Sequence, residues 1–454
     1  WLSQHGGSPE ERRRGLSGAA WSGYKLGKLP EAAALFQQLL DAKPPAPMAA
    51  EAALARGRIL EELGQLDPAL AMFDQVVKDH ADAKVKEYPL ALLAAARLHR
   101  RLDQHRQSAE LYKRLADGFP DLADRDTVLY EWSWVLFDQE DAAASNALLA
   151  KLRAEHPKSR YWTDATYRLA VRGFQAKDYP AAAQFGNEII GSDAQGELRE
   201  HALYLLARIA AADAERDGKW DLVREHFERL LATFPNTPTR LVAEFWIAES
   251  LYRQQKFVES LAEFERLAQQ TQGQPGDWLA MIPLRRAQLL AHQRKWNEAY
   301  AIASKIAEQF PGFQQQYEAD YVVGRCLAAL ADFDGARQAY EKVINSEHGA
   351  KTETAAMAQW MIGETFFHQK QYDVAMREYL RVARLYAYPK WQAGSLLQGA
   401  KCRELLGEPE EAAKLYAEVL AEYADTPFAE QAKERLEAAR SGKPQSPPVP
   451  AAEN

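Results

Sequence analysis

The sequence has few cysteines, no long apolar segment and no excess of positive charge. Cys326 and Cys402 are its only cysteines among 454 residues, and they give no indication of the redox environment. Apolar stretches are short, as where Arg208 interrupts the stretch that ends at Ala207, so none reaches the roughly 18 residues needed to span a bilayer. The formal net charge is −8, which disfavours nucleic acid as a partner because phosphate binding requires a basic surface.

The sequence also lacks the motifs of catalysis and metal binding. It contains no His-Glu-x-x-His and no Gly-x-Ser-x-Gly, and its cysteine spacing fits no zinc site. Gly191 and Gly196 have the spacing of a phosphate-binding loop, but Glu197 follows where that loop requires Lys. We therefore expect no enzyme, no cofactor and no metal site.

What the sequence does contain is a small residue that recurs every 37 to 41 residues. A period of this length is typical of a solenoid, in which one supersecondary unit is stacked repeatedly. The eleven positions are Ala20, Gly57, Ala96, Ser133, Ala170, Ala211, Ala248, Ala287, Gly324, Gly363 and Ala400.

A second small residue follows most of these positions after twelve residues, and a large residue comes four residues later. Apolar residues at three- and four-residue spacing flank a turn between the two small positions, so each unit is predicted to be helix, turn, helix. Small side chains allow two helices to pack about 8–10 Å apart, and we expect the large residue to fill the space against the next unit. The clearest pairs are Ala32 and Phe36, Ala69 and Phe73, Ser108 and Tyr112, Ser260 and Phe264, Ala336 and Tyr340, Ala375 and Tyr379, and Ala412 and Tyr416.

This combination, with a closing proline such as Pro235 or Pro311, resembles the tetratricopeptide repeat over residues 20–440. The resemblance implies an all-α protein, an α-solenoid or right-handed superhelix of about eleven helix–turn–helix repeats with a C-terminal capping helix. Links such as Pro235-Asn236-Thr237 are similar to those of a bacterial cell-envelope subset. That subset includes outer-membrane assembly lipoproteins and periplasmic cell-division coordinators.

We expect two continuous arrays, divided at the longest interval, between Ala170 and Ala211. The loop 191–196 then separates an N-terminal array of about five repeats (1–190) from a C-terminal array of about six repeats and the capping helix (198–440). The alternative is that this loop is an ordinary surface insertion. The proline-rich tail, 441–454, is expected to be disordered. Two repeats separate the cysteines, which puts them roughly 20 Å apart, so we expect buried thiols and no disulfide.

In tetratricopeptide arrays the first helix of each repeat lines an inner groove, through residues one, four and five places after the small residue. The resemblance gives these candidates: Arg58, Arg97, Arg100, Arg101, Trp134, Phe137, Glu249, Tyr252, Arg325, Glu364 and Phe367. Arginines could bind an acidic segment through bidentate contacts, or form a solvated face paired with acids such as Glu110. The aromatic residues would be binding anchors if exposed, or packing between repeats if buried.

The predicted function is a non-catalytic scaffold or adaptor that binds protein or peptide segments in the groove. The alternative is an architectural solenoid that self-associates through its ends or its convex face. The bacterial periplasm or cell envelope is the expected location, with the cytoplasm as the alternative. The chain begins at Trp1 rather than Met, which we take as an indication of a removed signal peptide, lipoprotein signal or upstream domain. The identity of the partner and the oligomeric state remain open.

Overall fold

The computed structural model describes residues 7–81, 85–274 and 276–441, and these ranges contain helices and turns but no β-strand. The predicted disordered tail lies outside the described residues, apart from Ser441 at the end of the last helix. The chain divides into two compact units, unit 1 (1–218) and unit 2 (219–454). In the ranges given above, no helix combines the length and the apolarity needed to cross a membrane.

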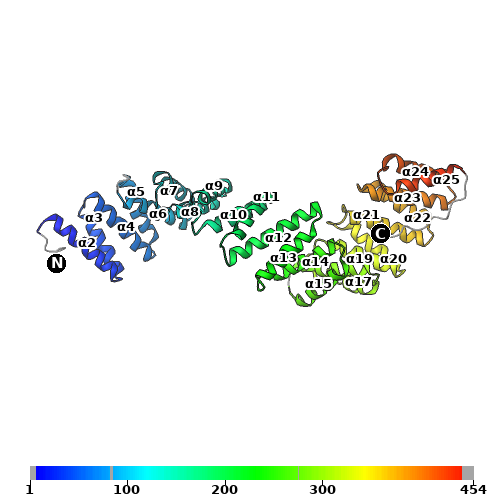
Figure 1. Cartoon of the computed structure of the whole chain (residues 1–454), viewed down its shortest axis with the longest axis horizontal. Coiled ribbons are helices and arrows are strands. Elements are labelled where there is room, and N and C mark those ends of the chain that lie inside the picture. The colour runs from blue at the N-terminus through cyan, green and yellow to red at the C-terminus, as the bar shows by residue number, and fades with distance from the viewer. Residues whose placement is uncertain (1–6, 82–84, 275, 442–454) are drawn as a thin grey trace. The chain divides into compact units, whose positions relative to one another are not determined.

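Unit 1 contains five helical hairpins, in which α2, α4, α6, α8 and α10 each pack against the helix that follows, and α12 packs against α11 (Figure 1). We call the even-numbered helices of this unit first helices, because they carry the recurring small residues. The loop 191–196, from which the sequence predicted a division of the array, connects two helices within unit 1. The helices are α2 (Pro9–Lys25), α3 (Leu29–Asp41), α4 (Ala46–Glu62), α5 (Leu66–Asp79), α6 (Glu87–Arg101), α7 (His105–Gly118), α8 (Arg125–Asp138), α9 (Ala142–Glu155), α10 (Trp162–Gln175), α11 (Tyr179–Gly191) and α12 (Glu197–Asp217).

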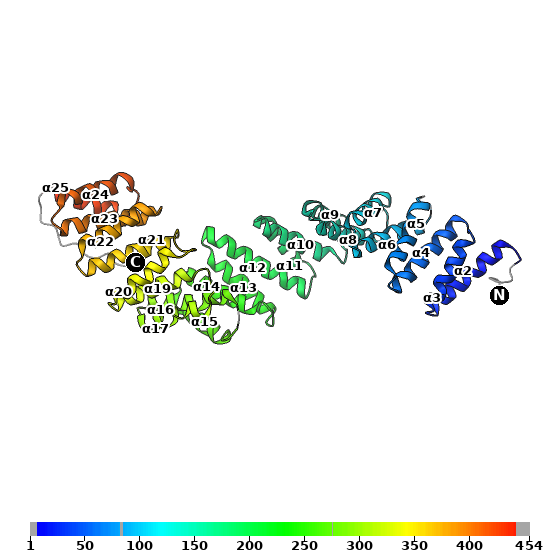
Figure 2. The same cartoon turned by 180° about the vertical axis from the view of Figure 1, so that it is seen from behind.

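Unit 2 begins with α13 and continues as five hairpins, whose first helices are α14, α16, α19, α21 and α23 (Figure 2). The terminal helix α25 covers the last hairpin, because its Ala432 and Leu436 are buried against Tyr416 and Val419. The helices are α13 (Trp220–Thr233), α14 (Arg240–Arg253), α15 (Phe257–Gln270), η1 (Asp277–Ala280), α16 (Met281–His292), α17 (Trp296–Ala303), α18 (Ile306–Gln309), α19 (Gln316–Ala329), α20 (Phe333–Asn345), α21 (Glu353–His368), α22 (Tyr372–Leu385), α23 (Pro389–Leu405), α24 (Pro409–Glu422) and α25 (Ala429–Ser441).

The predicted fold class, an all-α solenoid of helix–turn–helix repeats with a capping helix, is confirmed. All eleven recurring small residues are buried, and each lies on the first helix of a repeat. Cys326 and Cys402 are buried free thiols, as predicted.

The aromatic residue of each repeat lies closer to its own hairpin than the sequence analysis expected. A Cβ atom built on Gly57 would lie 2.5 Å from the ring of Phe73, and one built on Gly363 would lie 2.7 Å from the ring of Tyr379. Both rings therefore pack directly over the small residue of their own repeat. Each aromatic residue thus holds the two helices of its own hairpin together. Contact with the next repeat is additional, as when the hydroxyl of Tyr112 donates to Glu131 at 2.9 Å.

Each hairpin turn contains one residue in the left-handed backbone region. Gly27 and Gly64 occupy this position in the first two turns, with φ of 72° and 74°, whereas Lys177 and Lys370 occupy it in later turns, both with φ of 60°. In the first turn, the backbone N–H of Lys28 donates to the carbonyl of Gly23, so the turn closes the end of the helix by hydrogen bonding. This repeated geometry fixes the angle between the two helices and thus which side of each first helix stays open.

Candidate protein-binding surface on the first helices

Adjacent first helices contact each other according to a simple register. The residue directly after the small residue of one repeat meets the residue two places before the small residue of the next. Four pairs follow this rule: Arg97 with Glu131, Trp134 with Arg168, Glu249 with Arg285, and Glu364 with Gln398. The first-helix positions predicted to line a groove therefore also connect neighbouring repeats.

The basic cluster of α6 is paired with acids from both neighbouring first helices. Arg97 forms a bidentate pair with Glu131, with both N–O distances 2.8 Å, and the hydrogen bond to this carboxylate raises the pKa of Arg97. Arg100 donates to Asp138 at 3.0 Å, and Arg101 donates to Glu61 at 2.5 Å. These three acids, rather than Glu110, compensate the predicted cluster. Most of the positive charge of this cluster is therefore used in ion pairs between neighbouring repeats.

Two arginines of α10 stack on the rings of Trp134 and Phe137 of α8. The guanidinium carbon of Arg168 lies 3.8 Å from the centroid of a Trp134 ring, and that of Arg172 lies 4.5 Å from the centroid of Phe137. The two aromatic rings are 6.0 Å apart in an edge-to-face arrangement. We call these four residues the arginine–aromatic cluster. Trp134 is half-buried and Phe137 is 38% exposed, so the cluster opens to solvent.

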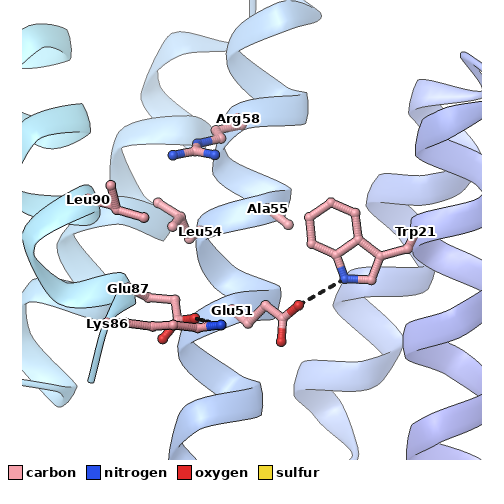
Figure 3. A pocket seen from close by; sticks show the side chains of 8 residues that line it. All are labelled: Trp21, Glu51, Leu54, Ala55, Arg58, Lys86, Glu87 and Leu90. Carbon is pink, nitrogen blue, oxygen red and sulfur yellow. Dashed lines mark hydrogen bonds and ion pairs between the residues drawn. The ribbon is translucent and has the colours of Figure 1, made fainter. Parts of the chain in front are cut away.

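A hollow of about 260 Å³ lies over α2, α4 and the start of α6. Figure 3 shows Trp21 and Leu90 on opposite sides of Leu54 and Ala55, with Arg58 near the floor that these two residues form. Arg58 is exposed, and among the described residues it has neither a hydrogen bond nor an ion pair. We call this the α2–α4–α6 hollow. It is lined by Trp21, Glu51, Leu54, Ala55, Arg58, Lys86, Glu87 and Leu90.

Polar and charged groups that line the hollow partly pair with one another. The indole N–H of Trp21 donates to Glu51 at 3.1 Å, and the ammonium of Lys86 lies 3.6 Å from Glu87. The indole is therefore held in place at one end by its hydrogen bond, while its apolar face remains available. This arrangement suits an incoming apolar group flanked by polar ones.

In unit 2, Glu249 and Tyr252 of α14 are bound to an arginine of the next first helix. Glu249 is buried and accepts hydrogen bonds from Arg285 at 2.7 and 2.8 Å and from Arg253 at 2.9 Å. Burial alone would raise the pKa of Glu249, but the two arginines outweigh it and the pKa is lowered. The guanidinium carbon of Arg285 also lies 4.6 Å from the Tyr252 ring centroid. Both candidates therefore make contacts between neighbouring repeats.

The other candidates of unit 2 are also engaged in packing. Glu364 is buried and accepts hydrogen bonds from Tyr379 at 2.6 Å and Gln398 at 2.9 Å, while burial raises its pKa. Phe367 is buried against Tyr372, with ring centroids 5.4 Å apart. Arg325 is half-buried, with its guanidinium 5.9 Å from the Trp296 ring.

The spacing rule identified much of this surface but missed four of its important residues. Trp21 directly follows Ala20, so the same rule applied to the first repeat would have found it. Leu90, Arg168 and Arg172 lie at other helical positions, and only the contacts between helices reveal them. The described residues contain no group of three or more His, Cys, Asp or Glu side chains arranged to hold a metal ion.

Family models for the tetratricopeptide repeat match residues 18–84 and 395–426, and a model for a tetratricopeptide repeat-like domain matches residues 216–360. The chain belongs to the tetratricopeptide-repeat family. Repeats of this family form scaffolds for protein interaction, generally without catalytic activity. The matched segments lie in both units and include the α2–α4–α6 hollow in part.

Several solved structures are similar to this tetratricopeptide-repeat chain at low identity. A tetratricopeptide repeat protein from Parabacteroides merdae is 14% identical, with 62% of this chain and 99% of that chain covered and a TM-score of 0.36. The pilF protein of Pseudomonas aeruginosa is 13% identical, with coverage of 52% and 96% and a TM-score of 0.39. The human IFIT1 dimer with m7Gppp-AAAA is 14% identical, with coverage of 86% and 90% and a TM-score of 0.40.

At this level of similarity the solved structures do not indicate a partner or a location for this chain, and membership of the cell-envelope subset is not confirmed. Among curated protein sequences there is no significant match.

Proposed function

We propose that this tetratricopeptide-repeat protein is a non-catalytic scaffold whose unit 1 captures a protein segment at the α2–α4–α6 hollow. The observation that supports this most directly is the combination of open apolar side chains with an unpaired cation. Leu90 is 42% exposed across the hollow from Trp21 (Figure 3), and Arg58 lacks a hydrogen-bond or ion-pair partner among the described residues. Apolar and aromatic groups flanked by Arg are the usual composition of an interaction hot spot.

The size of the hollow favours one side chain of a protein segment over a small-molecule ligand. Small-molecule sites usually measure about 300–1,000 Å³, whereas this hollow measures about 260 Å³ and is open. One large apolar side chain would fit between Trp21 and Leu90, and the flanking residues of the segment would meet Arg58 and Glu51. The bound segment would thus run across three consecutive first helices.

The test is site-specific photo-crosslinking in the cells that produce the protein. A photoreactive amino acid replaces Leu90, and the same amino acid replaces Leu222 as a control, because both leucines are 42% exposed. We expect a discrete protein adduct from position 90, lost in Arg58→Glu, and none from position 222. Equal adducts from the two positions, or an adduct that persists in Arg58→Glu, would contradict capture at the hollow.

The architectural alternative has less support. The most exposed large apolar residues, Leu26, Val258 and Leu385, belong to three different hairpins. Single exposed apolar residues are normal on protein surfaces and do not form an association face. Sedimentation analysis over a range of concentrations distinguishes the two proposals, because self-association would raise the mass with concentration.

We also propose a bacterial cell-envelope location and the absence of a nucleic-acid partner. The first rests on the Pro-Asn-Thr type of link, and the second on the net charge of −8. Cell fractionation tests the location, with recovery in the cytoplasm as the contrary result. Titration of labelled single-stranded RNA with the full chain tests the second, and binding of the RNA would be the contrary result.

A further inference from the structure

The arginine–aromatic cluster presents two guanidinium groups at fixed positions on one helix face. Arg168 and Arg172 are one helical turn apart on α10, which separates them by about 6 Å. Trp134 and Phe137 support them from α8, with distances of 3.8 and 4.5 Å to the ring centroids. Stacking on an aromatic ring restricts a guanidinium group, so less conformational entropy remains to be lost on binding.

Three other arginines that stack on aromatic rings in the described residues also bind a carboxylate. Arg285 stacks on Tyr252 and binds Glu249. Arg153 stacks on Phe185 and binds Glu188. Arg337 follows the same pattern with Phe366 and Asp334. In these cases the ring orients the guanidinium group and a nearby acid neutralises it.

Arg168 and Arg172 differ from these three arginines. Within the described residues, neither has a carboxylate within 4.0 Å. Arg168 donates to the hydroxyl of Ser133 at 3.0 Å, and Arg172 donates to the side chain of Gln175 at 3.4 Å. A guanidinium group has five N–H donors, so both arginines retain donors for a ligand.

The acids close to the cluster are already bound to other groups. Asp138 accepts from Arg100, and Asp164 accepts from the hydroxyl of Tyr130 at 2.6 Å. Burial lowers the pKa of Arg168, so its charged form is poorly solvated where it lies. The charge of Asp164 offsets part of this burial cost, and an incoming carboxylate would offset more of it.

We propose that Arg168 and Arg172 bind two acidic side chains of a protein segment that lies across α8 and α10. This inference rests on the proposed function, because it specifies the chemistry of a segment held by the first helices of unit 1. Alternate residues of an extended chain are about 6.5–7 Å apart, which matches the spacing of the two arginines. Asp or Glu at alternate positions, or one helical turn apart, would bind both guanidinium groups together.

A protein segment suits the cluster better than RNA does. The arginine–aromatic cluster offers two guanidinium groups without a carboxylate partner, and Asp138, Asp164 and Glu131 lie on the same two helices. Nucleic-acid binding usually depends on a row of phosphate contacts, which these acids would repel. Two separate carboxylates avoid that repulsion because they need not extend past the arginines.

The experiment measures fluorescence anisotropy of a labelled oligo-glutamate peptide titrated with the full chain. Labelled oligo-glutamine and single-stranded RNA serve as further probes. We expect the oligo-glutamate to bind and the oligo-glutamine and RNA not to bind. The double variant Arg168→Gln/Arg172→Gln should weaken peptide binding about ten- to hundred-fold, the usual effect of losing charge-assisted hydrogen bonds.

Two variants separate binding from folding. Arg172→Gln loses the weak polar contact with Gln175 of its own helix and the stacking on Phe137 at an open site. Neither contact is buried in the core, so the variant should fold normally and still weaken binding several-fold. Arg106→Gln is the matched control, because Arg106 is an exposed arginine on the second helix α7, and it should leave binding unchanged. Unchanged affinity in both Arg172→Gln and the double variant would overturn the proposal, as would binding of RNA in place of the peptide.

The outcome is also distinguishable from failure of the proposed function. Leu90→Glu changes the hollow but not the cluster, so oligo-glutamate affinity should remain as in the unaltered chain. If the crosslink at position 90 is found while oligo-glutamate does not bind, the acidic-segment proposal is wrong and capture at the hollow stands.

Discussion

The first helices of units 1 and 2 carry charged residues close to the recurring small residue, but these charged residues have different surroundings. In unit 1, Arg58 is exposed and unpaired among the described residues, and Arg168 and Arg172 stack on aromatic rings without a carboxylate. In unit 2, Glu249 and Glu364 are buried and accept hydrogen bonds from the neighbouring first helix. Charge pairing between helices therefore decides whether a first-helix residue is held in packing or left open to solvent.

The difference has an energetic basis. A buried charge costs free energy through desolvation, and removing its partner is more costly than never burying the charge. Charges that are buried in unit 2 thus hold adjacent repeats in register, whereas open cations in unit 1 remain available to a ligand. Substitutions in each unit test this contrast.

Removal of Arg285 should be far more destabilising than removal of Arg172. Arg285→Met leaves the carboxylate of Glu249 buried with only Arg253 beside it, which should lower the free energy of unfolding by about 3–5 kcal/mol. Arg172→Met loses a stacking contact at an open site, worth about 0.5–1 kcal/mol. Urea unfolding followed by circular dichroism gives both values. Equal losses in the two variants would contradict the contrast between the units.

Replacement of Lys401 should stabilise unit 2. Lys401 is buried on α23, and burial lowers its pKa from 10.5 to about 8. The unfolded chain therefore binds this proton more tightly, so stability rises with pH between about 8 and 10.5, and the cost of the charge is complete below pH 8. Lys401→Met should raise the free energy of unfolding by about 1–3 kcal/mol at neutral pH.

The pH dependence provides the check on that prediction. The advantage of Lys401→Met over the unaltered chain should shrink as pH rises through 8 toward 10.5. Lys414→Met is the matched control, because Lys414 of α24 is exposed and pairs with Glu411 on the surface. It should show no such trend. A constant advantage for Lys401→Met at every pH would mean that removal of the charge is not its cause.

Enlarging the small residue under the aromatic ring should disturb the packing of a hairpin equally in both units. Gly57→Ala in unit 1 and Gly363→Ala in unit 2 each bring a Cβ atom within 2.5–2.7 Å of an aromatic ring, so each should cost about 1–3 kcal/mol. Gly399→Ala has only ordinary contacts, beginning at 3.6 Å, and should stabilise by about 0.5–1 kcal/mol because alanine favours helix. Thermal melts of the three variants test whether ring contact sets the sign.

These residues show what could be predicted from the sequence. Small residues at regular spacing, such as Ala20 and Gly57, follow from close helix packing, which is local and repeats with the chain. The arginine candidates Arg97 and Arg100 were found as first-helix residues, but their partners lie 34 and 38 residues further along. Which acid faces which arginine depends on the exact register between neighbouring helices. For the same reason, the spacing rule could not separate exposed Arg58 from buried Glu364.

Substitutions in the hairpin turns should change stability only slightly, and by similar amounts in the two units. Lys177 in unit 1 and Lys370 in unit 2 have φ of 60°, a conformation that costs a residue with a Cβ atom about 1–2 kcal/mol. Glycine relieves that cost but adds conformational freedom to the unfolded chain, so Lys177→Gly and Lys370→Gly should each raise the free energy of unfolding by only about 0.5 kcal/mol. Gly64→Ala, at φ of 74°, should lower it. If the lysine variants were destabilised instead, these side chains would have a contact role in the turn that outweighs backbone strain.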